Sequence, residues 1–316
     1  MAAPRKKQLP RRRVIVIGSL NLDHFARVEV LPRPGDTVSA TRLTRFYGGK
    51  GANQAIAAAR QGSAVVLLGA VGSDEAGEAY LRFLEEEGVS TRNIRIVDCP
   101  TGTAFITVDQ SGENMIVVAA GANAELRRTD IIREAPRIKE SDILVGQFEV
   151  PFSALLESIC IANQSKVPVL INPSPFRPGF LWEEVRTDYL VVNENEAVAL
   201  LGIAPVPSAA REVRDQLHAL RIRHLIVTRG GEETLHFTQE GEVFAIPVLP
   251  VLPVDTVGAG DAFAGCLAAR LSQGEPIASA LRAANCAGAL TTLGSGAQGP
   301  MPDRDQVERH LRFLDL

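Results

Sequence analysis

Six short apolar runs recur along this chain, and stretches with helical patterning separate them. Each run is continuous rather than alternating, and the six cover residues 14–18, 65–69, 143–147, 167–171, 189–192 and 225–228. Strands buried on both faces have this composition, which is typical of parallel sheets. Gly62 and Gly88 close two of the intervening helical stretches, residues 51–61 and 75–87. The pattern predicts an α/β fold with a doubly wound, mainly parallel sheet flanked by helices.

The composition fits one large or two modest globular domains and excludes a chain that is disordered throughout. Of the 316 residues, 46% are hydrophobic and 22% are charged. The four cysteines have no Cys-x-x-Cys spacing, so we expect small core residues in a reducing compartment, with no disulfide and no zinc. No apolar run is long enough for a membrane span. These features predict a cytoplasmic protein.

The beginning of the chain is strongly basic. The first 13 residues hold six basic side chains and no acidic one, and we interpret residues 1–12 as a disordered tail before a domain at 13–316. Without those six side chains, 27 basic residues stand against 37 acidic ones. Because duplex nucleic acid is itself densely negative, it is not an expected partner of this acidic body.

Two segments break the alternation of strands and helices, residues 27–47 and about 101–121. The second contains two apolar stretches joined by Gln110-Ser-Gly-Glu113, which is typical of a β-hairpin. We expect a small antiparallel sheet set apart from the main one. Edge strands of the main sheet are the alternative.

The segment Asp255-Thr-Val-Gly-Ala-Gly-Asp261 precedes an apolar run at residues 262–269 that predicts a buried helix. The first N–H groups of a helix lack partners and attract anions, and Gly258 and Gly260 let the backbone approach one closely. A carboxylate at such a place repels phosphate, so Asp261 needs another task, and accepting a proton from a hydroxyl is the obvious one. The segment predicts phosphoryl transfer to an alcohol, with simple helix capping by Asp261 as the alternative.

Two familiar phosphate-binding motifs are absent. The P-loop requires Ser or Thr after Gly-Lys, whereas Gly51 follows Lys50, and Thr44 stands where its first glycine belongs. The dinucleotide fingerprint requires glycine or alanine where Phe263 stands. Neither a P-loop nucleotide hydrolase nor a dinucleotide-dependent oxidoreductase is indicated.

Polar residues follow most of the apolar runs. In open α/β sheets, ligands bind beyond the carboxyl ends of the strands, so these side chains are candidate ligands. They are Asn21, Asp23, Glu149, Asn172, Asn193, Glu196 and Thr228. We expect Asn21, Asp23 and Glu149 to bind the hydroxyls of a polyol. Asn193 and Glu196 are suited to holding water or Mg²⁺ near phosphates, since Mg²⁺ prefers oxygen ligands.

A second glycine-rich turn, Gly48-Gly-Lys-Gly51, enters an alanine-rich helix. A cation at a helix N-terminus opposes the helix dipole, so Lys50 is poorly placed for stability. This indicates that Lys50 serves a ligand, with a solvent-facing lysine as the alternative.

Four stretches together resemble the ribokinase family of sugar kinases, the phosphofructokinase-B type: residues 18–23, 48–54, 193–196 and 255–261. The resemblance covers roughly residues 13–303. It implies ATP-dependent phosphorylation of D-ribose at its primary hydroxyl. Deoxyribose, fructose or a nucleoside is the alternative substrate, and a sugar-sensing protein, which we would expect to have lost Asp261, is a distant alternative.

The resemblance also implies roles for individual residues. Asp261 is the expected base, and the amides of the turn stabilise the transferring phosphoryl group. The expected sugar ligands are Asn21, Asp23, Gly49, Lys50, Asn53, Glu149 and Asp261. The expected ATP-binding residues are Asn193, Thr228, Gly230, Gly258, Ala259, Gly260 and Asn285. Glu196 would organise Mg²⁺ through water, and the small sheet would cover the sugar as a lid and pair two subunits as a homodimer.

The family further implies a monovalent cation, usually potassium. The residues expected around it, mainly through main-chain oxygens, are Asp255, Val257, Thr291, Gly294 and Gly296. Pro300 stands where these kinases often have a serine that helps to bind the ion, which predicts altered potassium activation. The acidic Gly231-Glu-Glu233 departs from the usual nucleotide loop and predicts weaker ATP binding.

Overall fold

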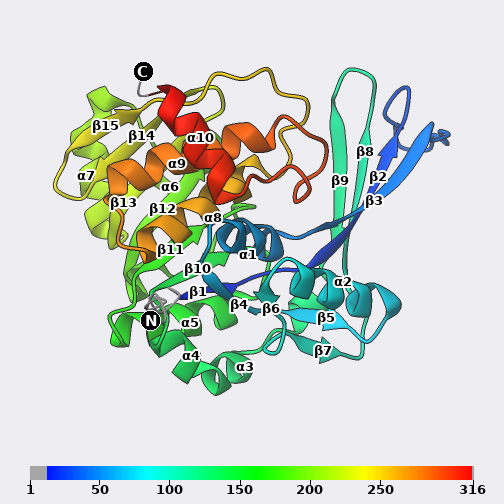
Figure 1. Cartoon of the computed structure of the whole chain (residues 1–316), viewed down its shortest axis with the longest axis horizontal. Coiled ribbons are helices and arrows are strands. Elements are labelled where there is room, and N and C mark those ends of the chain that lie inside the picture. The colour runs from blue at the N-terminus through cyan, green and yellow to red at the C-terminus, as the bar shows by residue number, and fades with distance from the viewer. Residues whose placement is uncertain (1–12, 315–316) are drawn as a thin grey trace, which may run out of the picture.

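The main body of the protein is a nine-stranded sheet with helices on both faces (Figure 1), in a computed structural model that describes residues 13–314. The predicted tail, residues 1–12, lies outside the described residues. The strand order is β15-β14-β13-β12-β11-β10-β1-β4-β6, with all neighbours parallel except at β14 and β15. The strands are β1 (Arg13–Ile17), β4 (Ala64–Leu68), β6 (Val89–Ser90), β10 (Ile143–Gln147), β11 (Val169–Asn172), β12 (Thr187–Asn193), β13 (Ile222–Arg229), β14 (Glu232–Thr238) and β15 (Val243–Ile246).

Alternate residues of β1 enter two different hydrophobic cores. Val14 and Val16 pack into one core, and Ile15 and Ile17 pack into the other. The first core includes residues of α1 (Lys50–Arg60), α2 (Glu75–Glu86), α8 (Ala259–Ser272), α9 (Ile277–Thr291) and α10 (Arg304–Leu314). The second includes residues of α3 (Arg128–Arg133), α4 (Ala135–Lys139), α5 (Phe152–Gln164), α6 (Glu194–Leu201) and α7 (Ala210–Ala219). The strand is therefore buried on both faces, and the expected doubly wound fold is confirmed.

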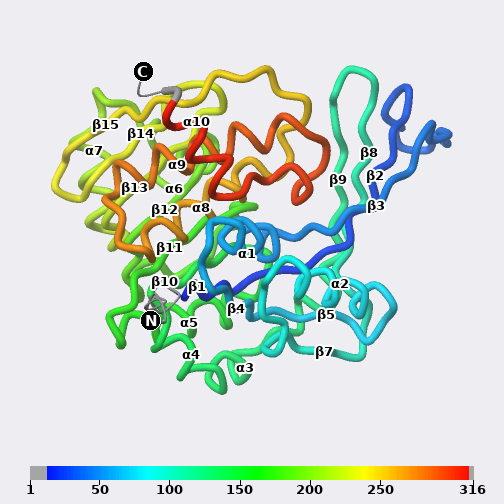
Figure 2. Tube along the Cα trace, viewed as in Figure 1, coloured from blue at the N-terminus to red at the C-terminus, as the bar shows by residue number. Residues whose placement is uncertain are grey.

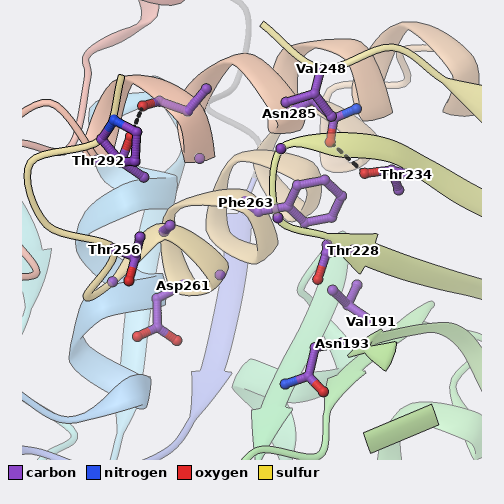
Figure 3. Close-up of a pocket in the computed structure, with 18 of the residues that line it drawn as sticks. Val191, Asn193, Thr228, Thr234, Val248, Thr256, Asp261, Phe263, Asn285 and Thr292 are labelled. Carbon is purple, nitrogen blue, oxygen red and sulfur yellow. Dashed lines mark hydrogen bonds between the residues drawn. The ribbon is translucent and has the colours of Figure 1, made fainter. Parts of the chain in front are cut away.

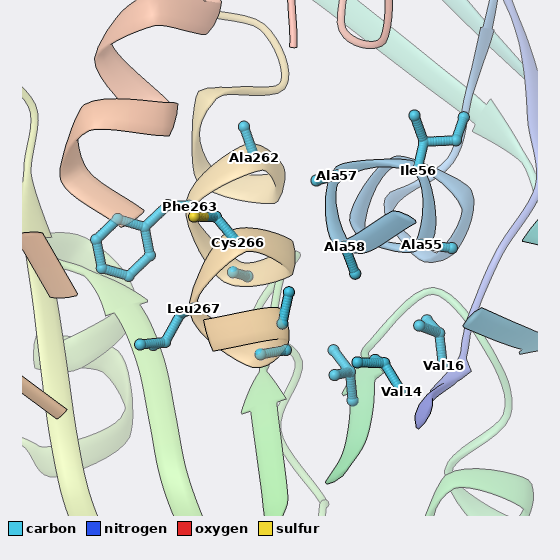
Figure 4. Packing of buried hydrophobic residues seen from close by; sticks show 14 of the residues in the cluster. Val14, Val16, Ala55, Ile56, Ala57, Ala58, Ala262, Phe263, Cys266 and Leu267 are labelled. Carbon is cyan, nitrogen blue, oxygen red and sulfur yellow. The ribbon is translucent and has the colours of Figure 1, made fainter. Parts of the chain in front are cut away.

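Small residues bring α1 and α8 together over the sheet (Figure 4). A Cβ on Gly265 of α8 would lie 2.4 Å from the main-chain oxygen of Gln54 and 2.6 Å from the Cβ of Ala57 in α1. Such a close approach leaves no room for a larger side chain. The contact holds the start of α1 beside the start of α8.

The small sheet stands apart from the main body, at the right of Figures 1 and 2. Its order is β3 (Arg42–Gly48), β2 (Asn21–Arg27), β8 (Gly102–Val108) and β9 (Asn114–Ala119). Neighbours are antiparallel except β2 and β8, which run parallel. The sequence placed the first strand too late: β2 begins at Asn21, and residues 28–41 form a connection without helix or strand. Because β2 is half-buried along most of its length, it shows no clear alternation in sequence.

The remaining elements are short. A two-stranded sheet pairs β5 (Ala70–Gly72) with β7 (Arg95–Val97), and three 3-10 helices cover Gly121–Glu125, Trp182–Glu184 and Pro207–Ala209. All four cysteines are free, and Cys266 and Cys286 are buried. Within residues 13–314, no helix combines the length and the apolar character needed to cross a bilayer.

Candidate active site

A cavity of about 730 Å³ opens at the carboxyl ends of β11, β12 and β13, beside the start of α8 (Figure 3). Its volume is in the range of small-molecule sites. Its lining includes every residue predicted to bind ATP, and Glu196: Asn193, Glu196, Thr228, Gly230, Gly258, Ala259, Gly260 and Asn285. Of the predicted sugar ligands, only Lys50 and Asp261 line this cavity. The other predicted sugar ligands lie beside the cavity, close to Lys50 and Asp261. They are Asn21, Asp23, Gly49, Asn53 and Glu149.

The turn before α8 has the conformation that its glycines predict. Gly258 is the N-cap, with φ at 81°, and a Cβ there would lie 2.7 Å from the Cα of Ala297. Only glycine fits both constraints. The first N–H groups of α8 therefore lie at the cavity, where they favour an anion.

Asp261 is buried in the first turn of α8, and side chains of α1 hold its carboxylate. Asn53 Nδ2 donates to Oδ2 at 2.8 Å, and Gln54 Nε2 donates to Oδ1 at 2.9 Å. The N-cap of this helix has no side-chain hydrogen bond. The alternative of simple helix capping by Asp261 therefore does not describe its contacts.

Lys50 lies among four carboxylates. Burial acts to lower its pKa, but the charges of Asp261, Glu149, Glu196 and Asp23 outweigh burial and raise it. The main-chain N–H of Lys50 donates to Glu149 Oε2 at 3.0 Å, and the Ser19 hydroxyl donates to the same oxygen at 2.5 Å. The ammonium group thus points to the site rather than to solvent, and the site is strongly acidic overall.

The surroundings of Asp23 strongly change the pKa of its carboxyl group. Burial, followed by the charges of Glu149 and Asp261, raises its pKa to about 7, and Lys50 opposes this only in part. Asp23 therefore changes its charge near neutral pH. Perturbation of this kind is typical of functional sites.

We expect Asp23→Asn to stabilise the free protein at pH 8 by about 2–4 kcal/mol and to stabilise it much less at pH 4.5. The folded protein keeps the Asp23 proton up to about pH 7, whereas the unfolded chain loses it near the ordinary aspartate pKa of 3.8. Stability of the wild type therefore falls as pH rises through this window, and Asn removes the fall. Thermal melts at both pH values measure the effect. The exposed Asp98→Asn is the matched control, and an equal gain at both pH values would contradict this account.

Gly49, at the N-cap of α1, lies against Asn21, the first residue of β2. Asn21 is buried, and its Oδ1 accepts from Asn123 Nδ2 at 2.8 Å. Gly49 has φ at 87°, and a Cβ there would lie 2.7 Å from the main-chain nitrogen of Asn21. These contacts fix the start of β2, and with it one end of the small sheet, beside the carboxylates around Lys50.

The part of the cavity near β12 and β13 is lined largely by apolar residues, and its polar side chains are bonded to other groups of the protein. Asn193 and Glu196 form a capping box at the start of α6, with bonds of 2.8 and 3.0 Å. The Thr228 hydroxyl donates to the Val192 carbonyl. Asn285 accepts from Thr234 (Figure 3) and donates to the carbonyls of Ile246 and Pro247. The side-chain amide of Asn285 therefore connects β14 to the segment after β15, and both of its N–H groups are already used in these bonds.

The five residues expected around a monovalent cation lie on two adjacent segments outside the cavity lining. Asp255 accepts from the main-chain N–H of Val257 at 3.0 Å and of Gly296 at 2.9 Å. Thr291 ends α9, and Gly294 packs against Pro300. Among the described residues, no group of three or more His, Cys, Asp or Glu side chains is arranged to hold a metal ion. A cation here would depend on main-chain oxygens.

Several polar residues contact the site although we predicted no role for them. They are Ser19, Gln54, Asn123 and Gln298. They fall within or beside the glycine-rich motifs or in short polar stretches, whereas Asn172, which bonds to Gln54, was already a candidate ligand. The signal was an amide or hydroxyl in an otherwise apolar or glycine-rich context.

Comparison with known proteins agrees with this geometry. The family model of pfkB family carbohydrate kinases matches residues 11–304. The ribokinase of Bacillus subtilis is 37% identical over 303 residues, covering 95% of this chain and 99% of that protein. The deoxyribokinase of Salmonella typhi is 33% identical, covering 94% and 98%. The structure of Arabidopsis thaliana ribokinase complexed with ribose and ATP has a TM-score of 0.86 at 28% identity, covering 96% and 99%.

The chain belongs to the pfkB family of carbohydrate kinases. The resemblance that the four motifs indicate is confirmed. The expected class of enzyme, a sugar kinase of the ribokinase type, is confirmed with it.

Proposed function

We propose that this protein transfers the γ-phosphoryl group of ATP to the primary (O5) hydroxyl of D-ribose, giving ribose 5-phosphate and ADP. The observation that carries the proposal is the buried carboxylate of Asp261. It lies in the first turn of a helix at the cavity, and two amides hold it. Relatives at 33–37% identity over nearly the whole chain include ribokinases and a deoxyribokinase.

In the proposed reaction, Asp261 accepts the proton of the sugar's primary hydroxyl as the hydroxyl oxygen bonds to the γ-phosphorus. The bond from that phosphorus to the β,γ-bridging oxygen breaks, and its electron pair leaves with ADP. The N–H groups of Gly258, Ala259 and Gly260 stabilise the charge on the transferring group, since they face an anion without reorganisation.

The sugar is bound by the acidic cluster beside the cavity. Hydroxyl groups donate well to carboxylates and bond in either sense with amides, so Asn21, Asp23, Asn53 and Glu149 suit a polyol. Lys50 offsets part of their charge, and Gly49 allows close approach of the backbone.

ATP is expected along Asn193, Thr228, Gly230 and Asn285. Four carboxylates around one ammonium repel its phosphates, so the donor set fits Mg²⁺, with Glu196 holding its waters. Bound Mg²⁺ would neutralise phosphate charge. The capping bond from the Asn193 N–H uses Glu196 Oε2 and fixes the carboxyl group at the rim.

A monovalent cation, potassium in our proposal, would be held by main-chain oxygens of Asp255, Val257, Thr291, Gly294 and Gly296. Asp255 supports this because it joins the two segments that carry those oxygens. The cation would add positive charge behind the turn of Gly258. Pro300 has no hydroxyl to offer, so we expect weak potassium activation.

The small sheet is proposed as a lid and as the contact of a homodimer in the cytoplasm. Its edge strand β9 is exposed along its whole length, and several apolar side chains of the sheet are exposed. They are Leu43, Phe105, Met115, Ile116, Val117 and Val118. An exposed apolar patch of this kind marks an interaction surface.

We expect the double variant Ile116→Glu/Val117→Glu to be monomeric. It places a charge on each face of β9, and an uncompensated charge in an apolar interface is strongly unfavourable. Size-exclusion chromatography with light scattering would then give the 33.9 kDa of one chain instead of twice that mass. Ile96→Glu changes an equally exposed isoleucine outside the small sheet and should leave the dimer intact. A variant that still dimerises would contradict the lid contact.

Phosphorus NMR of the product tests the proposed reaction. Incubation with ribose, ATP and Mg²⁺ should give ribose 5-phosphate and ADP in equal amounts. Phosphate at another position of the sugar would contradict the assigned acceptor. Faster turnover of 2-deoxyribose would instead favour the second candidate, a deoxyribokinase, which a relative at 33% identity supports.

A further inference from the structure

Two consecutive residues of α1 donate to the two oxygens of Asp261. Asn53, an expected sugar ligand, donates to Oδ2, and Gln54 donates to Oδ1. Gln54 is completely buried and does not line the cavity. It therefore does not contact a ligand in the cavity itself. It can influence the reaction only through the residues that it contacts, of which Asp261 and Asn172 line the cavity.

The hydrogen bonds of Gln54 leave only one orientation for its amide. A carboxylate can only accept, so the nitrogen of Gln54 must face Asp261. The same nitrogen donates to Asn172 Oδ1 at 3.1 Å, while Gln147 Nε2 donates to Gln54 Oε1 at 2.7 Å. Asn172 in turn donates to the Val191 carbonyl at 2.9 Å, which turns its oxygen toward Gln54.

The chain of amides connects the ends of β10 and β11 to Asp261. Gln147 ends β10 and Asn172 ends β11, so rigid strands hold both partners of Gln54. A side chain locked in this way can fix the plane of the carboxylate that it contacts. An N–H donor to a carboxylate also favours its ionised form, which is the form that accepts a proton.

We propose that Gln54 is a positioning residue for phosphoryl transfer, acting by holding the carboxylate of Asp261 in a fixed orientation. The inference rests on the proposed role of Asp261 as the base. Gln54 belongs to the same helix as Lys50 and Asn53. The start of α1 therefore supplies two expected sugar ligands, the positive charge of Lys50 and the side chains that orient Asp261.

The test is the pH dependence of turnover in Gln54→Met, which keeps the size of the side chain and removes the donor. We expect kcat to fall about 10- to 100-fold, the loss that corresponds to one hydrogen bond to a charged group. The KM for ribose should stay within about threefold. The acid limb of the pH–kcat profile should move to higher pH than in the wild type, because the ionised carboxylate has lost a donor. Lys50, Asp23 and Glu149, the charged groups that face the same site, are the same in both proteins.

Gln54→Glu gives the opposite pH response and carries the test if Gln54→Met does not fold. While protonated, the new carboxyl group can still donate to Asp261. Once it ionises, two buried carboxylates face each other. Turnover should therefore be highest at acid pH and fall as pH rises. A profile with the wild-type shape would overturn the proposal.

Gln61→Met is the matched control near the other end of α1. Gln61 is also buried, and it bonds to Arg270 and to the Pro302 carbonyl, not to Asp261. It should lower the melting temperature without moving the pH–kcat profile. If Gln54→Met behaves in the same way while Asp261→Asn is inactive, only the role of Gln54 is refuted. If Asp261→Asn turns over normally, the proposed function fails first.

Discussion

Asp261→Asn is expected to lower kcat about 10²- to 10⁴-fold, the range typical for the loss of a general base. The amide that replaces the carboxylate cannot accept the hydroxyl proton. Its shape is nearly the same, and its one oxygen can still accept from Asn53, although Gln54 then faces an N–H group. We expect the cavity to remain in place and ribose to bind within about threefold of the wild-type Kd. Single-turnover kinetics and calorimetry with ribose separate the two effects.

Two outcomes would contradict this assignment. Near-normal turnover would show that Asp261 is not the base. Loss of ribose binding together with turnover would make Asp261 chiefly a sugar ligand. Glu157→Gln is the control for the general effect of losing a carboxylate. Glu157 lies on α5 and forms an ion pair with Arg128 of α3.

Gly258→Ala is expected to reduce both stability and turnover. The residue has φ at 81°, and a Cβ would approach Ala297 Cα to 2.7 Å and Ala297 O to 2.9 Å. Left-handed strain and the clash with a backbone together should lower the free energy of unfolding by roughly 2–5 kcal/mol. Displacement of the turn should lower kcat about 10²-fold or more, as when a donor to a developing anion is lost.

Gly274→Ala separates the two causes. Gly274 has φ at 83°, just after the same helix, and a Cβ there meets nothing within 4 Å. It should lose only the roughly 1–2 kcal/mol of left-handed strain and keep wild-type kcat. Urea unfolding and steady-state kinetics on both variants decide the matter. Equal kinetics for the two alanine variants would argue against a catalytic role for the Gly258 turn.

Much of the fold could be predicted because its signals are local. A strand such as β1 is buried on both faces, so a continuous apolar run identifies it directly. β2 gave a weaker signal, because most of its residues are only half-buried. Its place in the small sheet depends on pairing with β8, about 80 residues later in the chain, and single-sequence patterning does not report such pairing.

In the candidate site, too, local features could be predicted from the sequence and contacts between distant residues could not. The place of Gly258 and Asp261 at the start of a buried helix could be predicted, since a glycine turn before an apolar run is typical of such a start. Their roles in the reaction stay predictions. The capping box of Asn193 and Glu196 could also be predicted from their spacing, although we expected both residues only to bind ligands. The role of Gln54 was not readable. It depends on a contact with a residue 207 positions away, and a buried glutamine looks the same in sequence whatever it contacts.

The measurement that tests the account most directly is the ratio of kcat/KM among ribose, 2-deoxyribose, fructose and adenosine, with ATP and Mg²⁺, with and without potassium. We predict that ribose is preferred by about tenfold or more over each alternative. A site built for the hydroxyl groups of ribose leaves its polar groups unpaired when a substrate lacks one of those hydroxyls or places them differently. Preference for another sugar would keep the mechanism and change the substrate. No turnover of any sugar, with ribose still binding, would contradict the account and favour a sugar-sensing protein.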